Sequence, residues 1–396
     1  MNQLSTYLQN TYTSNYITGT ADCNLLVWGS KGEMEHTVKL CSLNIGFEYD
    51  PFSVDKDQAE NYIGSLKERS KVYNKLFEYG SKFSDIIGIP FIIIVYPCLR
   101  KEFNNNWELS RQNYPEGDVM FYCKNITDGD QFVCSGKELR SKINYYLQIE
   151  ALDEGTIKDK NKRISDYFHM WSRDFLSKSI SKFDVDGFII NDEIGKAALI
   201  EFKRSNTPPI PFWYPEYDRP DYKLQLLFAQ KIGADFWLLH HEDTECDPET
   251  NISFFKIESV TNEEYSYVKS SFRAMKLPLQ GNNSLDTMIS RFIQSGDIGS
   301  YNDGRDNLYC PLCGSLILSG MYGKYCPQKC GMVFGKYLGQ ELDDSQILDL
   351  ITGNSIAAVK ASGDEITIYP HLTSNQHEGK TYYFWSGSKY CHNCLQ

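Results

Sequence analysis

The side chains best suited to chemistry lie in the segment 183–205, where two apolar stretches carrying acidic residues flank a short polar turn. Residues two apart on a β-strand point to the same side, so Glu201 and Lys203 share one face of the second stretch. If the turn is centred between residues 193 and 194, Asp186 stands opposite Glu201, and directly opposed residues of a hairpin lie about 5 Å apart. Two carboxylates this close would repel each other without a cation, so the spacing predicts a metal site.

Carboxylates of this kind are suited to a hard cation. Magnesium is held by one or two carboxylates and keeps several waters, and in such a site it stabilises charge on a phosphate and generates hydroxide. A neighbouring ammonium can orient the attacking water or stabilise the charge that develops. We therefore expect Asp186 and Glu201 to bind magnesium or manganese and Lys203 to act on the scissile phosphodiester. Asp184, opposite Lys203 in the same register, is a candidate second acid.

An acid-x-Lys pattern alone carries little information, because the chain contains it at Glu201–Lys203, Asp221–Lys223 and Glu378–Lys380. Only the first lies on an apolar stretch that follows a second acidic stretch at hairpin spacing. The alternative is an edge hairpin with a cross-strand salt bridge. Against it, residues 197–200 are apolar on both faces, as in a buried central strand, where charged side chains usually have a function.

This segment resembles the PD-(D/E)xK nucleases, the restriction-endonuclease-like superfamily, in which an acid on one strand precedes acid-x-Lys on the next and helices flank both. The matching residues are Asp186, Glu201 and Lys203, and the resemblance covers residues 146–278. Val185 stands where many members have proline. The resemblance implies a mixed-sheet core, metal-dependent cleavage of DNA, and a following helix whose Lys223 and Gln225 could contact DNA.

Four acidic or imidazole side chains near this segment are weaker candidates. Asp166 and Asp174 fall on the helix before the hairpin, where family members often place a further acid, and a surface position is the alternative. His240 and His241 end a later strand, where a core or surface histidine is the ordinary interpretation.

A second chemical motif lies near the C-terminus. Two pairs of cysteines, each followed directly by glycine, offer four thiolates to one tetrahedral zinc. Glycine at that point lets backbone amides turn toward the sulfurs. We therefore predict a structural zinc site, with a redox pair as the alternative. The four predicted ligands are Cys310, Cys313, Cys326 and Cys330.

The region 309–338 resembles the zinc ribbons at the C-terminus of type IA topoisomerases, and the stretch from Leu342 to about Trp385 resembles a small repeat of those enzymes. Such ribbons contact single-stranded DNA through basic and aromatic residues, which stack on bases and pair with phosphates. The alternative is that the aromatic side chains close a small core around zinc. Cys391 and Cys394 are half of a second site or an untethered thiol pair. The residues of the ribbon in question are Tyr309, Tyr322, Lys324, Tyr325, Phe334, Lys336 and Tyr337.

These motifs require a framework, and the hydrophobic pattern predicts an α/β fold: a restriction-endonuclease-like mixed-sheet core between an N-terminal α/β domain and a small zinc ribbon region. No internal repeat of fixed period is apparent. The predicted strands and helices before the hairpin are strands at 24–28, 36–45 and 90–96, a helix at 55–79, two short strands in 120–136 and a helix at 162–181. From the hairpin onward they are strands at 183–191 and 196–203, a helix at 221–232 and strands at 235–240 and 252–257. The predicted domains are 1–145 (α/β, of unknown role), 146–278 (nuclease), 279–307 (linker), 308–340 (zinc ribbon) and 341–396 (small topoisomerase-like domain).

Composition limits the class of protein. A chain of 396 residues with 41% hydrophobic residues can build two or three cored domains. Its net charge of −12 does not exclude nucleic acid as partner, because phosphate binding needs only a local basic surface. Seven Lys or Arg against three Asp between Lys158 and Lys182 provide one, although solvated surface is the ordinary interpretation of such a run. The candidate DNA-binding residues of this run are Lys158, Lys160, Lys162 and Arg163.

Cysteine usage and hydropathy indicate the compartment. Single cysteines scattered through a long chain that shows no signal peptide are typical of a reducing cytosol, so we expect a cytoplasmic protein. The most apolar run, 86–99, is shorter than the roughly 20 residues of a membrane helix and contains two prolines, so no membrane partner is expected.

Three functions remain open on these grounds. The first is a DNA endonuclease of restriction or phage defence, acting alone or as a homodimer. The second is a repair or recombination nuclease on branched or single-stranded DNA. The third is a non-catalytic zinc-ribbon protein that binds nucleic acid and whose hairpin acids are structural.

Overall fold

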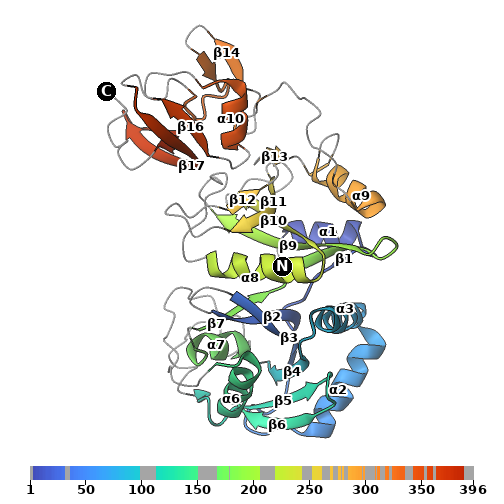
Figure 1. Cartoon of the computed structure of the whole chain (residues 1–396). Coiled ribbons are helices and arrows are strands. Elements are labelled where there is room, and N and C mark those ends of the chain that lie inside the picture. Colours follow the sequence, from blue (N-terminus) through green and yellow to red (C-terminus); the bar gives the residue numbers. More distant parts are fainter. Residues whose placement is uncertain are drawn as a thin grey trace. The chain divides into compact units, whose positions relative to one another are not determined.

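The computed structural model has a mixed α/β architecture, as the sequence predicts (Figure 1). The chain divides into two compact units, Met1–Phe188 with Lys223–Ala234, and Ile189–Tyr222 with Asp235–Gln396. The predicted domain boundary after residue 145 does not coincide with this division. The structure describes residues 3–31, 36–98, 113–149, 167–177, 179–205, 219–242, 252–260, 268–270, 275–277, 279–280, 284–296, 298, 308, 310–312, 317–320, 323–334, 342–351, 355–359 and 363–387.

The first unit contains a six-stranded sheet in the order β6-β5-β4-β3-β2-β7. Strand β3 is parallel to β4, and the other neighbours are antiparallel. The predicted strands at 24–28, 36–45 and 90–96 are thereby confirmed. The strands are β2 (Cys23–Lys31), β3 (His36–Phe47), β4 (Phe91–Pro97), β5 (Met120–Asn125), β6 (Gln131–Ser135) and β7 (Ile180–Asp184). The helices of the unit are α1 (Gln3–Thr11), α2 (Lys56–Arg69), α3 (Lys71–Ile87), α6 (Gly136–Leu147), α7 (Tyr167–Asp174) and, from residue 223 onward, α8 (Arg219–Lys231).

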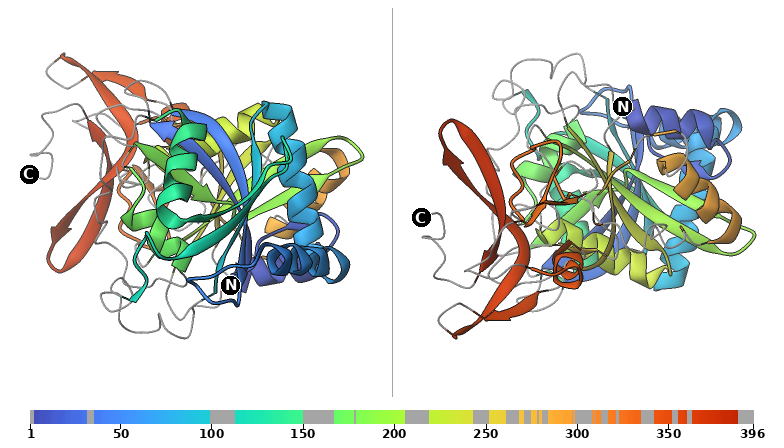
Figure 2. Two further views of the ribbon diagram at one scale, coloured as in Figure 1. Left: turned by 90° about the horizontal axis from the view of Figure 1, so that it is seen from below. Right: turned by 90° about the horizontal axis from the view of Figure 1, so that it is seen from above.

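Both faces of this sheet are covered, because its central strands are apolar on both sides. Helix α3 packs on the face of Leu25 and Phe91, which a Cβ on Gly80 of this helix would touch. Helices α6 and α7 cover the opposite face, where Trp28 packs edge-on against Phe168 at 6.2 Å (Figures 1 and 2).

The single helix predicted at 55–79 is two helices. Ser70 ends α2 and begins α3: its backbone is extended, its N–H donates to the carbonyl of Leu66, and its hydroxyl accepts from the amide of Tyr73. A serine that satisfies the terminal groups of both helices stabilises a break that hydrophobic spacing does not reveal.

The segment before the predicted hairpin differs from expectation in two ways. The helix predicted to run to residue 181 ends at Asp174, and Ile180–Asp184 form strand β7. The strand predicted at 183–191 is divided, because β7 pairs antiparallel with β2, where Asp184 is opposite Leu26. Asp184 therefore pairs within the first sheet and not with β9, so the predicted hairpin register does not extend to it; its part as a second acid stays a prediction. The amide of Val185 donates to the carbonyl of Leu25 and so keeps the chain hydrogen-bonded to β2 up to residue 185, which separates β7 from the strand that follows.

A second sheet has the order β1-β8-β9-β10-β11-β12, with β13 also paired to β11. Strand β10 is parallel to β9 and antiparallel to β11, and α8 connects the parallel pair. The predicted strands and helix from residue 196 to 257 are thus confirmed. The elements are β1 (Tyr16–Ile17), β8 (Gly187–Asn191), β9 (Lys196–Ser205), α8 (Arg219–Lys231), β10 (Asp235–Glu242), β11 (Ile252–Val260), β12 (Val268–Ser270) and β13 (Met275–Leu277).

The linker predicted at 279–307 is wrong in its central part, which forms helix α9 (Leu285–Ser295). Ser284 caps the helix, and Phe292 on its buried face packs edge-on against Trp237 of β10, with ring centroids 4.8 Å apart. The side-chain amide of Asn191 donates to the carbonyl of Ile293. The polar residues that suggested a linker flank a helix whose apolar face is buried.

The C-terminal part of the second unit has a core of its own. The predicted boundary at residue 340 does not separate two cores, because Phe334 of the ribbon packs edge-on against Trp385 at 5.8 Å. A two-stranded ribbon and a three-stranded sheet contribute to this core. The elements are β14 (Leu318–Gly320), β15 (Gly323–Tyr325), α10 (Asp344–Ile351), β16 (Ile356–Val359), β17 (Glu365–His377) and β18 (Lys380–Gly387).

No helix in the described parts of the chain combines the length and the apolar character needed to cross a bilayer.

Candidate functional site

Strand β9 carries the predicted acid-x-Lys pair. It lies between β8 and β10 in the sheet, and Ala198, Leu199 and Ile200 before the pair are buried. In the parallel register with β10, Glu201 is opposite Leu238 and Lys203 is opposite His240. Alternating side chains place all four residues on one face of the sheet.

The position of the Lys203 ammonium is restricted by an aromatic ring on this face. Its ammonium lies 5.5 Å from the ring centroid of Tyr222, in the first turn of α8. Tyr222 is buried and tilts against Phe236 of β10, with ring centroids 6.3 Å apart. A cation above a tyrosine ring is attracted by about 0.5–2 kcal/mol, so the ring orients the ammonium.

His240 completes this face and is 3% exposed. Of the two ordinary interpretations of this histidine, core and surface, the core position is the one observed. Tyr222 was not identified from the sequence, although its place in the second acid-x-Lys match puts it at the beginning of a predicted helix. Burial of an aromatic ring against an opposed strand is a tertiary property, and local sequence carries no signal for it.

Asp186 belongs to the first unit and lies between β7 and β8, directly before the first residue of β8. Its backbone carbonyl accepts a hydrogen bond of 2.7 Å from the hydroxyl of Thr18. The next residue is Gly187, where a Cβ would lie 2.6 Å from the ring of Tyr16. Glycine is therefore required for the close approach of β1 that holds the Asp186 backbone.

The charge of the Asp186 carboxylate affects the pKa of Tyr16, a residue of β1. Burial raises the pKa of Tyr16 well above its usual value, and the charge of Asp186 raises it further. The hydroxyl of Tyr16 lies 3.0 Å from that of Ser5, which partly opposes the shift. The side chain of Asp186 is half-buried near these groups. Glu201 belongs to the second unit, so the predicted register of Asp186 with Glu201 remains a prediction.

Two side chains proposed from the superfamily resemblance differ from expectation in burial. Gln225 is 2% exposed, so it is not placed to contact DNA, and this part of the DNA-binding prediction is wrong for the conformation described. It faces inward because α8 is buried on that side, with Leu224 and Phe228. Lys223 is half-buried. Asp174 is buried at 6% exposure and not on the surface.

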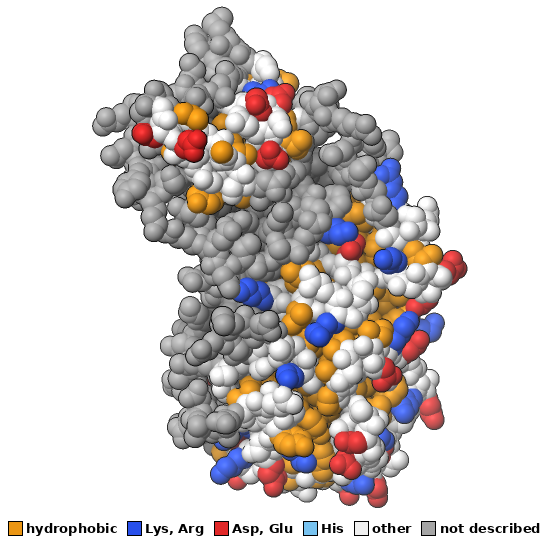
Figure 3. Space-filling view, viewed as in Figure 1, with side chains coloured by type: hydrophobic (Ala, Val, Ile, Leu, Met, Phe, Trp, Pro, Cys, Tyr) orange, Lys and Arg blue, Asp and Glu red, His pale blue; other side chains and the backbone are white. Residues whose placement is uncertain are grey.

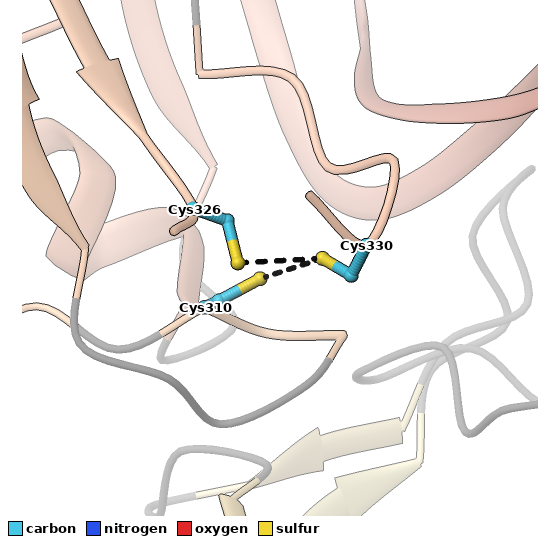
Figure 4. A group of neighbouring side chains, drawn as sticks. All are labelled: Cys310, Cys326 and Cys330. Atoms are coloured by element: carbon cyan, nitrogen blue, oxygen red, sulfur yellow. Dashed lines mark hydrogen bonds between the residues drawn. The ribbon is translucent and has the colours of Figure 1, made fainter. Parts of the chain in front are cut away.

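Three of the four predicted zinc ligands lie together. The sulfur of Cys330 is 3.4 Å from that of Cys310 and 3.6 Å from that of Cys326 (Figure 4). A tetrahedral zinc with Zn–S bonds of about 2.3 Å separates its sulfurs by about 3.8 Å, close to these spacings. A disulfide would need about 2.05 Å, so these three sulfurs are too far apart to be disulfide-bonded to one another. The donor set therefore fits a zinc ion. Cys313 lies outside the described residues.

The backbone around the second cysteine pair is specialised. Lys329 and Gly331 have positive φ values of 50° and 94°, and the amide of Lys329 donates to the carbonyl of Cys326. A Cβ on Gly331 would lie 2.3 Å from the carbonyl oxygen of Thr381 in β18. Gly331 is thus required by the turn and by the strand that packs against it.

The candidate DNA contacts of the ribbon differ in their exposure and in their ion pairing. Phe334 is 2% exposed and belongs to the core, so the alternative interpretation holds for it. Tyr325 is 47% exposed. Lys324 forms an ion pair of 2.5 Å with Asp344, which neutralises it locally. The other candidates of the ribbon, Tyr309, Tyr322, Lys336 and Tyr337, lie outside the described residues.

So do the candidates of other segments: Lys158, Lys160, Lys162, Arg163, Asp166, Cys391 and Cys394.

Basic side chains are dispersed on the visible surface. On the face drawn in Figure 3, the Lys and Arg side chains of the described residues are scattered, some beside acidic side chains and others among uncharged ones, and form no continuous basic patch. A basic contact surface for phosphates would therefore have to include residues beyond those described, or lie on another face.

No protein-family model matches the chain, and no curated protein sequence is significantly similar to it. Within the described ranges, Cys310, Cys326 and Cys330 form the one group of three or more His, Cys, Asp or Glu residues close enough to share a metal. A magnesium site of one or two carboxylates completed by waters does not require such a group.

Proposed function

We propose that the chain is a magnesium- or manganese-dependent nuclease that hydrolyses phosphodiester bonds of DNA, with a zinc-stabilised C-terminal module. Asp186 and Glu201 are the proposed ligands of the catalytic ion, and Lys203 is the proposed catalytic ammonium. The observation that carries the proposal is the placement of Glu201 and Lys203 side by side on β9, which has neighbours on both sides.

This placement argues against the edge hairpin as the reason for the two charges. An edge strand can carry charged residues toward solvent at little cost, and charges there protect against aggregation. Strand β9 is not an edge strand, and the three residues before Glu201 are at most 1% exposed. Half-buried charges at the end of such a strand are costly unless they bind a partner, and they are a common mark of functional sites.

The arrangement of the lysine and the aspartate also suits catalysis. The ring of Tyr222 directs the Lys203 ammonium, and a hydrogen bond from Thr18 holds the backbone of Asp186. Catalytic groups are effective when their geometry is established before the substrate binds. Tyr222 and Thr18 both lie outside the segment 183–205 that carries the lysine and the aspartate.

The proposed reaction is hydrolysis. The oxygen of a water forms a bond to phosphorus, the bond from phosphorus to one bridging oxygen breaks, and a proton from the water ends on the leaving oxygen. A magnesium ion, when bound, stabilises the phosphate charge and lowers the pKa of its water. Glu201 and Asp186 hold negative charge where the ion binds, and Lys203 stabilises charge on the phosphate oxygens as the bond to water forms.

The test is cleavage of supercoiled plasmid and single-stranded circles by the zinc-loaded protein, with magnesium or with chelator. Glu201→Gln should abolish cleavage, because the amide keeps the shape and loses the charge that binds the ion. The matched control is Glu378→Gln, in the third acid-x-Lys match at the exposed turn between β17 and β18, which should cleave like the wild type. Wild-type rates in Glu201→Gln would reject the proposed function.

A further inference from the structure

The order of elements occurs twice in the chain. Helix α1 is followed by β1, β2, β3, the helices α2 and α3, and then β4, β5 and β6; helix α7 is followed by β7, β8, β9, helix α8, and then β10, β11 and β12. The sheet positions correspond, since β6-β5-β4-β3-β2 and β12-β11-β10-β9-β8 have the same order. Strand directions correspond wherever both are described: β3–β4 and β9–β10 are parallel, and the next two pairs are antiparallel. This is a repeat of architecture, which the absence of a sequence period concealed.

The first strands of the two repeats are exchanged. Strand β1, which precedes the β2–β3 hairpin, is the neighbour of β8, and β7, which precedes β8, is the neighbour of β2. Exchange of identical elements between two copies of a fold is a known route to paired structures. It requires that both hairpins present equivalent edges, which supports the correspondence of the repeats.

The correspondence assigns partners to the candidate catalytic residues. Asp22 directly precedes β2, as Asp186 directly precedes β8. The register of β2 with β3 pairs Cys23 with Ile45, so Asp22 is next to Gly46, whose amide donates to its carbonyl at 2.9 Å. With Asp186 opposite Glu201, as the sequence spacing predicts, the tetrapeptide Ile45–Glu48 (Ile-Gly-Phe-Glu) corresponds to residues 200–203 (Ile-Glu-Phe-Lys).

The first repeat therefore keeps one acid and lacks the other two groups. Gly46 stands where the second repeat has Glu201, and Glu48 reverses the charge of Lys203. The space for a longer side chain is filled, because a Cβ on Gly46 would lie 3.2 Å from the hydroxyl oxygen of Tyr96 and 3.3 Å from a carboxylate oxygen of Asp22. Tyr96 is opposite Gly46 in the parallel register, where the second repeat has Leu238 opposite Glu201.

We propose that the first repeat is a catalytically incomplete copy of the second, so that each chain has a single centre for a divalent ion and cuts one strand of duplex DNA per encounter. The duplication of elements stands on strand order and strand direction, and the matching of single residues also uses the predicted register of Asp186 with Glu201. The statement about strand cutting rests on the proposed nuclease function, because each strand needs one hydrolysis and one centre performs one at a time.

The number of centres is tested by titrating the full, zinc-loaded chain with Mn²⁺ in a calorimeter. The wild type should bind about one Mn²⁺ in addition to zinc. Asp186→Asn should lose this site and its matched counterpart Asp22→Asn should retain it. With supercoiled plasmid, nicked circles should accumulate before linear DNA in the wild type and in Asp22→Asn. Loss of Mn²⁺ binding in Asp22→Asn, or two Mn²⁺ sites in the wild type, would overturn the single-centre assignment.

The duplication itself is tested by supplying the missing ligand. Gly46→Glu combined with Tyr96→Leu introduces the second acid and the side chain of Leu238, and should give one more Mn²⁺ site than the wild type. Gly46→Asp with Tyr96→Leu is a smaller version for use if the first variant does not fold. A folded variant without an additional site would overturn the correspondence. A wild type that binds no Mn²⁺ would reject the nuclease proposal and the single centre, whereas an additional site in the variant would still support the duplication.

Discussion

The hydroxyl of Thr18 donates a hydrogen bond of 2.7 Å to the backbone carbonyl of Asp186, across 168 residues of sequence. It joins the N-terminal segment to the residue that we propose as a metal ligand. Two neighbouring features act with it, the ring of Tyr16 and the absence of a side chain at Gly187. The N-terminal segment thus has a positioning role in the proposed site.

Removing that hydrogen bond should affect cleavage more than folding. Thr18→Val keeps the shape of the side chain and should cost about 1 kcal/mol of unfolding free energy. The cleavage rate should fall because Asp186 is less well positioned, while the fold measured by circular dichroism is retained. Thr37→Val removes a comparable side-chain contact, to Ser30 at 2.7 Å, and should leave the cleavage rate unchanged. Equal rates for the two variants would contradict the positioning role of Thr18.

The contact between Lys203 and Tyr222 predicts a graded series. Lys203→Ala should lower the cleavage rate by on the order of 10²–10⁴-fold while DNA binding is largely preserved, as for a group that acts in the transition state. Tyr222→Phe keeps the ring beneath the ammonium and should stay near the wild-type rate. Tyr222→Leu should lose about fivefold, because the cation–π attraction that orients Lys203 is lost. A Phe variant slower than the Leu variant would show that the ring does not act through its π face.

The cysteine cluster predicts a structural metal. Purified protein should contain about one tightly held zinc per chain, and Cys326→Ser should lose it and loosen the C-terminal core. Gly331→Ala should have a similar effect without removing a ligand, because the new Cβ meets the carbonyl of Thr381 at a residue with φ of 94°. Metal analysis and limited proteolysis measure both effects, and the first unit should remain folded. A zinc-free protein with an intact C-terminal module would contradict this prediction.

A carboxylate of the first unit predicts acid sensitivity. Partial burial alone would raise the pKa of Glu60, but hydrogen bonds from Lys124 and Tyr122 outweigh it and hold this pKa below its usual 4.5. A lowered pKa means that the stabilisation is fully present above pH 4.5 and is lost as the pH falls through the folded-state value. Glu60→Gln should therefore be less stable than the wild type near neutral pH, with a difference that shrinks in acid. Thermal melts at several pH values measure it.

Periodicity and spacing were sufficient for the α/β class, for most strands, and for the side of β9 on which Glu201 and Lys203 lie, because alternation along a strand is a local property. The cysteine spacing likewise predicted a cluster that brings three of its members together. Such features depend on residues close in sequence.

Other features depended on the tertiary structure. Distant segments compete for hydrogen bonds and apolar surface, and this competition divides the predicted strand at residue 185 and pairs β7 with β2. It also produces helix α9 within the expected linker. The burial of Tyr222 and Gln225 and the hydrogen bond from Thr18 to Asp186 arise in the same way. The architectural repeat was also invisible in the sequence, since strand order constrains hydrophobicity and length but leaves most residue identities free. Local sequence determined which residues could do chemistry, and long-range packing decided what surrounds them.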